Sequence, residues 1–379
     1  MKNIYYWSPC LDKVGTYKST INSAISLARY SKKKYKIKII NACGEWNDCK
    51  ELFSSSNIEL INFGFNYFKY LPKKGFLGSR FSYFVIIFTS IFPLIKLLKK
   101  EKPDFLVMHL ITLLPLLLTK FFYRSTNFIL RISGYPKLNL FRKFFWKLSS
   151  NRIFKITCPS VDLIHQLNDK NIFLKQKICF LPDPILNIKD FVKKKWSPIE
   201  EFKLERKYFV SVGRLTKQKN FEYLINEYKE FKNKNPDYNL LIFGDGELKQ
   251  KLQNKINKEG LKNHVFLMGY SNNIFKFMKG AEAFLLSSLW EDPGFVIIEA
   301  AMCNLFVISS NCKNGPSEFL NFGKGGILYE SNKRGALEQS LSEFLISENK
   351  KEKKVLSKKN CTKYTIFRHY NYLNKILLN

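Results

Sequence analysis

Two glutamates eight positions apart, Glu291 and Glu299, enclose a Pro-Gly-Phe turn that suits a loop leading into a helix. Proline fixes φ and lacks only an amide hydrogen that a first helical turn does not need. The apolar run 283–286 just upstream is typical of a short buried strand. We therefore expect Glu291 in the loop after that strand and Glu299 early in the helix, beside a helix N-terminus that favours phosphate. The spacing alone does not identify a site, because paired glutamates are common on solvated helices.

A second cluster follows an apolar segment that runs into Gly213, Arg214 and, after a short loop, Lys219. Arginine presents a planar fork of donors to a diphosphate, and lysine presents a compact charge. Two further apolar segments, 239–243 and 264–268, also end in glycines. Strands that alternate with helices and end in glycines indicate an α/β protein with a doubly wound parallel sheet, whose ligand lies at the carboxyl edge of the strands.

Taken together, these segments resemble the nucleotide-sugar half of the retaining family 4 glycosyltransferases over about residues 178–330. That family has the GT-B fold, in which two Rossmann-like domains with doubly wound parallel sheets face a central cleft. The motifs that carry the resemblance are Gly213-Arg214-Leu215 with Lys219, Gly244-Asp245-Gly246, Glu291 through Glu299, and Asn314-Gly315-Pro316-Ser317-Glu318.

The resemblance implies a hexosyltransferase that moves a sugar, with retention, from a nucleotide-diphosphate sugar. Arg214 and Lys219 would stabilise the departing diphosphate, because fixed cations aimed at developing charge are the most effective device. Glu299 would accept hydrogen bonds from the ribose hydroxyls, and Glu291 would lie near the sugar or the diphosphate. We expect a front-face mechanism in preference to Glu291 acting as a covalent nucleophile.

Further donor contacts are expected around these residues. Gly15, in the first strand–helix loop, would let the backbone approach the diphosphate. His109, at the end of an expected strand, is a candidate for an acceptor or sugar contact, with a purely structural role as the alternative. No DxD-type pair follows a strand, so we expect donor binding to need no metal and no cofactor. The full set of donor contacts is Gly15, Gly213, Gly244, Gly246, Met268, Gly269, Tyr270, Gly294, Phe295, Val296 and Glu299.

Length and element order favour two domains, since 379 residues can bury two cores. We expect an N-terminal acceptor-binding domain over residues 1–188, an irregular linker over about 189–204, and a nucleotide-sugar domain over 205–363. A last helix over 364–379 is expected to pack back on the first domain, as in the resembled fold.

The net charge of +32 is unevenly distributed. Residues 1–195 carry 34 basic and 11 acidic residues, a balance of +23, against +9 for the remainder. A lysine-rich composition, as an AT-rich genome would produce, explains the level of charge better than its asymmetry. A basic, aromatic N-terminal half suits an anionic membrane surface, a lipid-diphosphate acceptor or nucleic acid. We favour the membrane surface.

The eight cysteines form no C-x-x-C pair and no secretory signal is visible, which favours reduced thiols in a cytoplasmic protein. Two apolar stretches, 81–98 and 105–123, are interrupted by proline and lysine and are expected in the core rather than across a bilayer. A monotopic membrane contact is the alternative for the first stretch. Its residues would be Phe76, Leu77, Phe81 and Phe84, with Lys73, Lys74 and Arg80 beside them.

The favoured function is a bacterial-type glycosyltransferase that builds a cell-surface polysaccharide or lipid-linked oligosaccharide, peripheral on the inner face of the plasma membrane. A soluble-acceptor enzyme of the same fold, such as a glucan or disaccharide synthase, is the alternative. A non-catalytic nucleic-acid-binding protein is a remote third interpretation, because no recognised nucleic-acid module is apparent. The sequence names neither the sugar, the nucleotide nor the acceptor, since fold-level analogy does not define a site.

Overall fold

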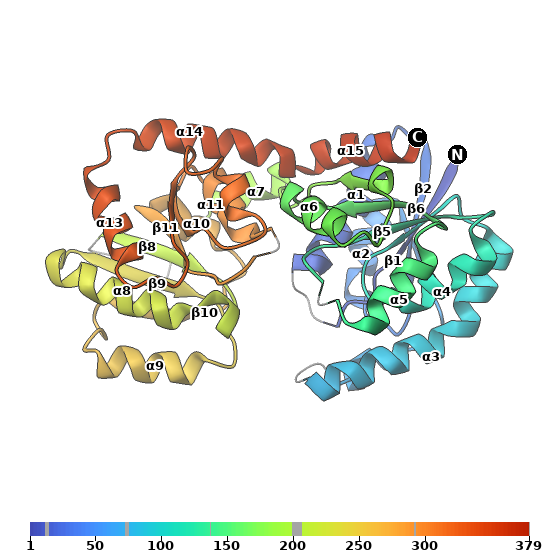
Figure 1. The fold of residues 1–379 in the computed structure, drawn as a ribbon, viewed down its shortest axis with the longest axis horizontal. Helices are drawn as coiled ribbons and strands as arrows, with labels where there is room; N and C mark the ends of the chain where they lie inside the picture. Colours follow the sequence, from blue (N-terminus) through green and yellow to red (C-terminus); the bar gives the residue numbers. More distant parts are fainter. Residues whose placement is uncertain (12–14, 73–75, 137, 199–206, 292, 379) are drawn as a thin grey trace. The chain divides into compact units, whose positions relative to one another are not determined.

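The chain forms two compact units, Met1–Ile185 with Ile366–Asn379, and Leu186–Thr365 (Figure 1). The computed structural model describes residues 1–11, 15–72, 76–136, 138–198, 207–291 and 293–378. Each unit contains one parallel sheet with helices on both faces, so the predicted α/β class is confirmed.

The first unit holds a seven-stranded sheet in the order β3-β2-β1-β4-β5-β6-β7. The last four residues of the first strand alternate between the two faces of the sheet and are all buried, with Ile4 and Tyr6 in one core and Tyr5 and Trp7 in the other. Strands buried on both faces carry continuous apolar runs of this kind. The strands are β1 Lys2–Trp7, β2 Tyr35–Asn41, β3 Ile58–Asn62, β4 Phe105–Met108, β5 Asn127–Arg131, β6 Ile153–Cys158 and β7 Ile178–Phe180.

Helices cover the two faces of this sheet. One face packs against α1 and α15, which also contact each other, and the other packs against α3, α4, α5 and α6. The side chain of Ser160 caps α6 by accepting a hydrogen bond from Leu163 N at 3.3 Å, a role for which serine is well suited. The helices are α1 Gly15–Tyr30, α2 Lys50–Ser55, α3 Phe76–Glu101, α4 Leu113–Phe122, α5 Leu140–Ser149, α6 Val161–Asp169 and α15 Ile366–Leu378.

The second unit holds a six-stranded parallel sheet in the order β10-β9-β8-β11-β12-β13. Its strands are β8 Lys207–Val212, β9 Tyr238–Phe243, β10 Val265–Gly269, β11 Ala283–Leu286, β12 Phe306–Ser310 and β13 Ile327–Tyr329. Its helices are α7 Ile188–Lys195, α8 Phe221–Lys234, α9 Lys249–Lys258, α10 Phe275–Gly280, α11 Phe295–Met302, α12 Pro316–Phe319, α13 Ala336–Ile346 and α14 Lys350–Cys361. Strand order reverses between β8 and β11 here and between β1 and β4 in the first unit, which is where doubly wound sheets bind ligands.

Two expectations about individual segments need correction. The stretch 189–204 was expected to be irregular, but most of its first half is α7, because Phe191 is buried and stacks edge-on against Phe275 of α10 at 5.1 Å. The stretch 81–98 was expected in the core, but α3 buries only one stripe of its residues. For the second stretch, 105–123, the expectation holds, because α4 buries Leu114, Leu116 and Leu118. Within the described residues, α3 is the one helix long and apolar enough to cross a bilayer by length and composition.

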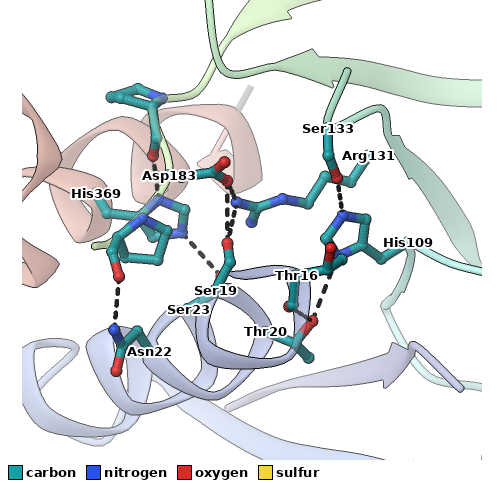
Figure 2. A network of polar contacts seen from close by, with 12 residues as sticks. Thr16, Ser19, Thr20, Asn22, Ser23, His109, Arg131, Ser133, Asp183 and His369 are labelled. Carbon is teal, nitrogen blue, oxygen red and sulfur yellow. Dashed lines mark hydrogen bonds and ion pairs between the residues drawn. The ribbon is translucent and has the colours of Figure 1, made fainter. Parts of the chain in front are cut away.

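A buried polar network joins α1 to the ends of β4 and β5 and to the segment after β7 (Figure 2). Arg131 at the end of β5 forms an ion pair with Asp183, and both side chains are buried. Ser19 of α1 links the two: its hydroxyl accepts a hydrogen bond from Arg131 Nη2 at 2.7 Å and donates to Asp183 Oδ1 at 3.0 Å. Burial lowers the pKa of Arg131 to about 10, so the guanidinium keeps its charge at neutral pH.

The same network anchors the last helix. His369 of α15 contacts the carbonyl oxygen of Pro182 through Nδ1 at 2.7 Å and the hydroxyl of Ser23 through Nε2 at 2.8 Å. Asn22 Nδ2 donates to the carbonyl oxygen of Pro184 at 2.6 Å. The chain crosses between the units at 185–186 and at 365–366. Each crossing therefore lies within a few residues of a hydrogen bond to α1. A carbonyl acceptor at Nδ1 fixes the neutral tautomer in which Nε2 accepts from Ser23.

Replacing Asp183 with alanine should destabilise the first unit by about 3–5 kcal/mol, because it leaves the Arg131 charge buried and unpaired. Chemical unfolding of the full chain measures this. Glu222→Ala breaks an exposed ion pair with Lys251 and is the matched control, with an expected cost below about 1 kcal/mol. Equal effects of the two substitutions would contradict the role given to the buried pair.

The pH dependence of stability should report His369. Burial lowers the pKa of this side chain from its usual value of 6.5 to about 3, so unfolding below pH 6.5 takes up a proton. The contribution of His369 to the free energy of unfolding is therefore fully present above pH 6.5. It falls as the pH drops toward about 3, by up to about 1.4 kcal/mol per pH unit. Between about pH 7.5 and about pH 5.5, unfolding free energies of His369→Gln should fall less steeply than those of the wild type. Parallel curves would show that His369 is not held neutral.

Candidate functional site

The loops after β8 and β11 meet at the point where the strand order of the second unit reverses. Val210 of β8 is in register with Phe284 of β11, so the carboxyl ends of both strands reach the same edge. Three hydrogen bonds then join the loops: Leu289 N to Gln218 O at 2.8 Å, Ser287 Oγ to Lys219 O at 2.8 Å, and Gln218 Nε2 to Trp290 O at 2.9 Å. The two sequence motifs that were identified separately therefore form one structure.

An ion pair between Lys219 Nζ and Glu291 Oε1 lies at the centre of this structure. The hydroxyl of Ser288 donates to the same carboxylate oxygen at 2.5 Å. The side chains of Lys219 and Glu291 are only 13% and 5% exposed, so water screens the pair weakly. The roles expected from the sequence are separate for these two residues, and their contact is not predicted. The structure shows that Glu291 orients the lysine and keeps a second carboxylate oxygen beyond this pair.

The start of α11 brings backbone amides and Glu299 to the same loop. Gly294 precedes the helix with a φ of 85°, and the first turn closes with a hydrogen bond from Ile297 N to Gly294 O at 3.2 Å. The backbone amides of Phe295 and Val296 precede Ile297 at the start of the helix. Amides in this position are the ones with which a helix N-terminus binds an anion. Glu299 is 8% exposed, on the second turn of the helix.

Arg214 contrasts with Lys219. It directly follows Gly213 in the loop after β8, and its side chain is exposed. Within the described part of the chain it has no ion-pair partner. Lys219 is therefore fixed by a carboxylate, whereas the guanidinium of Arg214 is accessible to a ligand.

Two glycines allow close backbone contacts beneath the site. A Cβ on Gly244 would lie 1.9 Å from the carbonyl oxygen of Gly213, and a Cβ on Gly315 would lie 2.1 Å from that of Pro293. The second contact brings the motif Asn314–Glu318 against the loop of Glu291, whose amide donates to Lys313 O at 3.1 Å. Both glycines adopt positive φ values, 138° and 136°. Only glycine fits these positions without backbone movement.

The remaining predicted donor contacts follow β9 and β10 on the same edge. Gly244 N donates to Gly269 O at 2.8 Å, which joins the two loops. Gly246 packs against the carbonyl of Leu215, and Met268 and Gly269 end β10. Tyr270 follows directly, with 78% of its surface exposed. All predicted donor contacts except Gly15 thus lie at the carboxyl edge of the second sheet.

Gly15 and His109 lie in the first unit, at its own reversal of strand order. Gly15 is the first residue of α1, and the preceding residues 12–14 are outside the described part of the chain. His109 directly follows β4, and its Nε2 contacts Ser133 Oγ while its Nδ1 contacts Thr20 Oγ1 at 3.3 Å (Figure 2). Burial, and to a lesser extent Arg131, hold the pKa of His109 well below its usual value. His109 is therefore neutral and fully engaged, which favours the structural alternative.

Comparison with known proteins identifies the family. A family model described as "Glycosyl transferases group 1" matches residues 192–360. The chain is also 34% identical to an uncharacterized glycosyltransferase of Methanocaldococcus jannaschii, over 69% of this chain and 71% of that protein. This chain belongs to the group 1 glycosyltransferases. The predicted glycosyltransferase family is thus confirmed at the level of group 1, and the matched residues contain the whole site of the second unit.

Two further similarities bear on this glycosyltransferase. It is 28% identical to N-acetylgalactosamine-N,N'-diacetylbacillosaminyl-diphospho-undecaprenol 4-alpha-N-acetylgalactosaminyltransferase of Campylobacter jejuni, over 60% of this chain and 63% of that protein. The crystal structure of a glycosyltransferase from Rickettsia africae superposes with a TM-score of 0.75 at 17% identity, covering 99% of this chain and 97% of the other. The second similarity concerns the fold alone and confirms the predicted GT-B architecture of two Rossmann-like domains.

Replacing Gly315 with alanine should disrupt this glycosyltransferase's site from outside it. The new Cβ would force Pro293 and the loop of Glu291 to move, and a displacement of about 1 Å costs on the order of a hundredfold in function. Gly335→Ala is the matched control, because Gly335 also has a positive φ of 78° but nothing within 4 Å of its Cβ position. The rate of nucleotide release from nucleotide sugars measures the difference. Similar losses in both variants would show that backbone strain, rather than the contact with Pro293, is responsible.

Proposed function

We propose that this glycosyltransferase transfers a sugar, with retention and without a metal or other cofactor, from a nucleotide-diphosphate sugar to a lipid-linked or polysaccharide acceptor. The observation that carries the proposal is the Lys219–Glu291 pair at the reversal of strand order, beside the start of α11. Together with the exposed Arg214, it places two cationic side chains and backbone amide donors where a diphosphate would bind.

The transfer step follows from these groups. The acceptor's hydroxyl oxygen bonds to the anomeric carbon on the face from which the diphosphate departs, and the bond from that carbon to the diphosphate oxygen breaks. The acceptor's proton passes to the departing diphosphate. Arg214 and Lys219 stabilise the charge that develops on the leaving group, and because they are in place beforehand, little reorganisation is needed during the reaction.

The glutamates have different roles in this proposal. Glu291 Oε1 already accepts from Lys219 and Ser288, so its charge is engaged in orienting the lysine. Its other oxygen is placed to bond a sugar hydroxyl. This engagement argues against Glu291 as a covalent nucleophile and for the front-face route. Glu299, on the buried side of α11, accepts from the ribose hydroxyls.

A lipid-linked acceptor is favoured by one relative and by the charge of the N-terminal half of the chain. The Campylobacter jejuni enzyme acts, by its name, on a diphospho-undecaprenol-linked sugar. Residues 1–195 carry a balance of +23, which suits a diphosphate acceptor and an anionic membrane at the inner face of the plasma membrane. A soluble acceptor remains the second candidate, because the chemistry at the donor site would be the same.

The test is nucleotide release from UDP-, GDP- and ADP-sugars, with and without membrane extract. One donor should be turned over faster with extract. Arg214→Ala and Lys219→Ala should each lower the rate by about a hundredfold, which corresponds to about 3 kcal/mol of lost leaving-group stabilisation. Glu299→Ala should mainly weaken donor binding. Lys217→Ala removes an exposed lysine from the same loop and is the matched control, with an expected rate close to that of the wild type.

Other results would change the proposal in defined ways. Turnover with a soluble sugar acceptor and no response to extract would favour the second candidate. Equal losses in Lys217→Ala and Lys219→Ala would show that general positive charge, rather than the paired lysine, supports the reaction. Salt-dependent RNA binding with no stabilisation by any nucleotide sugar would contradict the proposal altogether.

A further inference from the structure

Helix α3 is more apolar on its outer stripe than on the stripe that faces the protein. The outer residues are Leu77, Phe81, Phe84, Phe88 and Phe92, which are 80%, 62%, 75%, 71% and 82% exposed. The inner residues are Ser82, Ile86, Ser90, Leu94 and Leu98, all fully buried. A helix on the surface of a water-soluble domain has the opposite pattern, with its apolar stripe inward. The outer stripe therefore requires an apolar partner.

Two neighbouring helices extend this apolar surface. α4 contacts both α3 and α5, and buried residues of all three helices belong to one core on the same face of the first sheet (Figure 1). α5 also points large apolar side chains outward. The exposed residues on these two helices are Leu117 and Phe121 of α4, and Leu140, Phe141, Phe144 and Leu148 of α5. We call the outer surfaces of α3, α4 and α5 together the apolar–basic face.

Positive charge surrounds the aromatic side chains on this face. The segments 76–100, 113–124 and 140–149 contain no acidic residue, and Glu101 at the end of α3 is paired with Lys38 of β2. The pKa of Arg142 on α5 is lowered by partial burial and then by the charge of Arg80 on α3, which shows that cations of the two helices lie near each other. The basic residues of the face are Arg80, Lys96, Lys99, Lys100, Lys120, Arg124, Arg142, Lys143 and Lys147.

We infer that the apolar–basic face docks on the surface of an anionic phospholipid bilayer, with its aromatic side chains among the acyl chains and its cations at the lipid phosphates. Aromatic residues and a polar face rich in lysine and arginine are the signature of interfacial helices. The inner stripe of α3 packs in the core of the unit, so the helix lies along the bilayer rather than across it. A second copy of this chain is a poor partner for the face, because two faces without acidic residues would repel each other.

This inference deepens the proposed function by naming the surface that brings the enzyme to a lipid-linked acceptor. α3 and α5 each lead from one parallel strand to the next, so their N-terminal ends lie toward the carboxyl edge of the sheet. The exposed apolar residues are concentrated in those N-terminal halves, from Leu77 and from Leu140. The carboxyl edge of the first unit, where Gly15 and His109 lie, is thus the edge nearest the docked part of both helices. Lys73 and Lys74, predicted beside this contact, are outside the described residues.

Vesicle flotation of the full chain tests the inference. The probes are vesicles of phosphatidylcholine alone and of phosphatidylcholine with phosphatidylglycerol, and the wild type should float only with the second. Phe84→Ser with Phe88→Ser should reduce partitioning by at least about tenfold. Lys143→Glu with Lys147→Glu should reduce it by about 25-fold or more, since each lysine near an anionic surface contributes about fivefold.

Matched controls lie on the second unit. Phe322→Ser with Ile346→Ser removes two apolar side chains that are 78% and 82% exposed, and Lys262→Glu with Lys351→Glu makes the same change in net charge as the α5 pair. Both controls should float like the wild type. Equal loss in the charge control would mean that net charge alone binds the vesicles and would overturn the inference. So would a wild type that floats with neither vesicle, or face variants that only change oligomeric state in solution.

Thermal stabilisation by nucleotide sugars separates this inference from the proposed function. The face variants should keep the wild-type stabilisation, because the donor site lies in the second unit. Flotation that depends on the face, without stabilisation by any nucleotide sugar, would support docking and contradict the proposed function. Stabilisation without flotation would support the donor site and overturn the docking surface.

Discussion

The parallel pairing of β8 with β11 is the constraint on which the catalytic unit depends. These strands are neighbours in the sheet but lie about seventy residues apart in the chain, with β9 and β10 formed between them on the other side of β8. Because parallel strands end at the same edge, the pairing brings two distant loops into contact. The hydrogen bonds between those loops then set Lys219 opposite Glu291. A buried cation of this kind needs a carboxylate beside it. The ammonium group of Lys219 is therefore held in position by Glu291 before any ligand binds.

The first unit solves a related problem with a larger polar network. α1 carries Ser19, Asn22 and Ser23 on a buried face, and an isolated polar side chain there would be costly. Each finds a partner on a different element: the Arg131–Asp183 pair, the carbonyl of Pro184, and His369 of α15. The result is that one helix collects the end of β5, the segment after β7 and the last helix of the chain. Polar specificity, rather than additional apolar area, holds these distant segments in register.

In α3, unlike in α1, large apolar side chains face the solvent while serines are buried. Its exposed phenylalanines gain nothing in water, while buried Ser82 satisfies its hydroxyl with the carbonyl of Pro72 at 2.6 Å. A sequence selected only for folding would exchange these two stripes. The cations around the phenylalanines keep such a surface soluble and select against partners of like charge. These properties suit a surface that stays exposed to water until it meets the surface of an anionic bilayer.

The sequence by itself determined most of the strands, the helix after Glu291 and the family, because apolar runs, glycines and a Pro-Gly turn are local signals. It did not determine which residues meet. The pair Lys219–Glu291, the pair Arg131–Asp183 and the packing of Phe191 on Phe275 all join residues more than fifty positions apart. Strand order decides such contacts, and strand order has no local signature. Likewise, composition marked α3 as apolar, but only its packing on the sheet decided that serines face inward and phenylalanines outward, since which side of an evenly apolar helix is buried depends on what lies beside it.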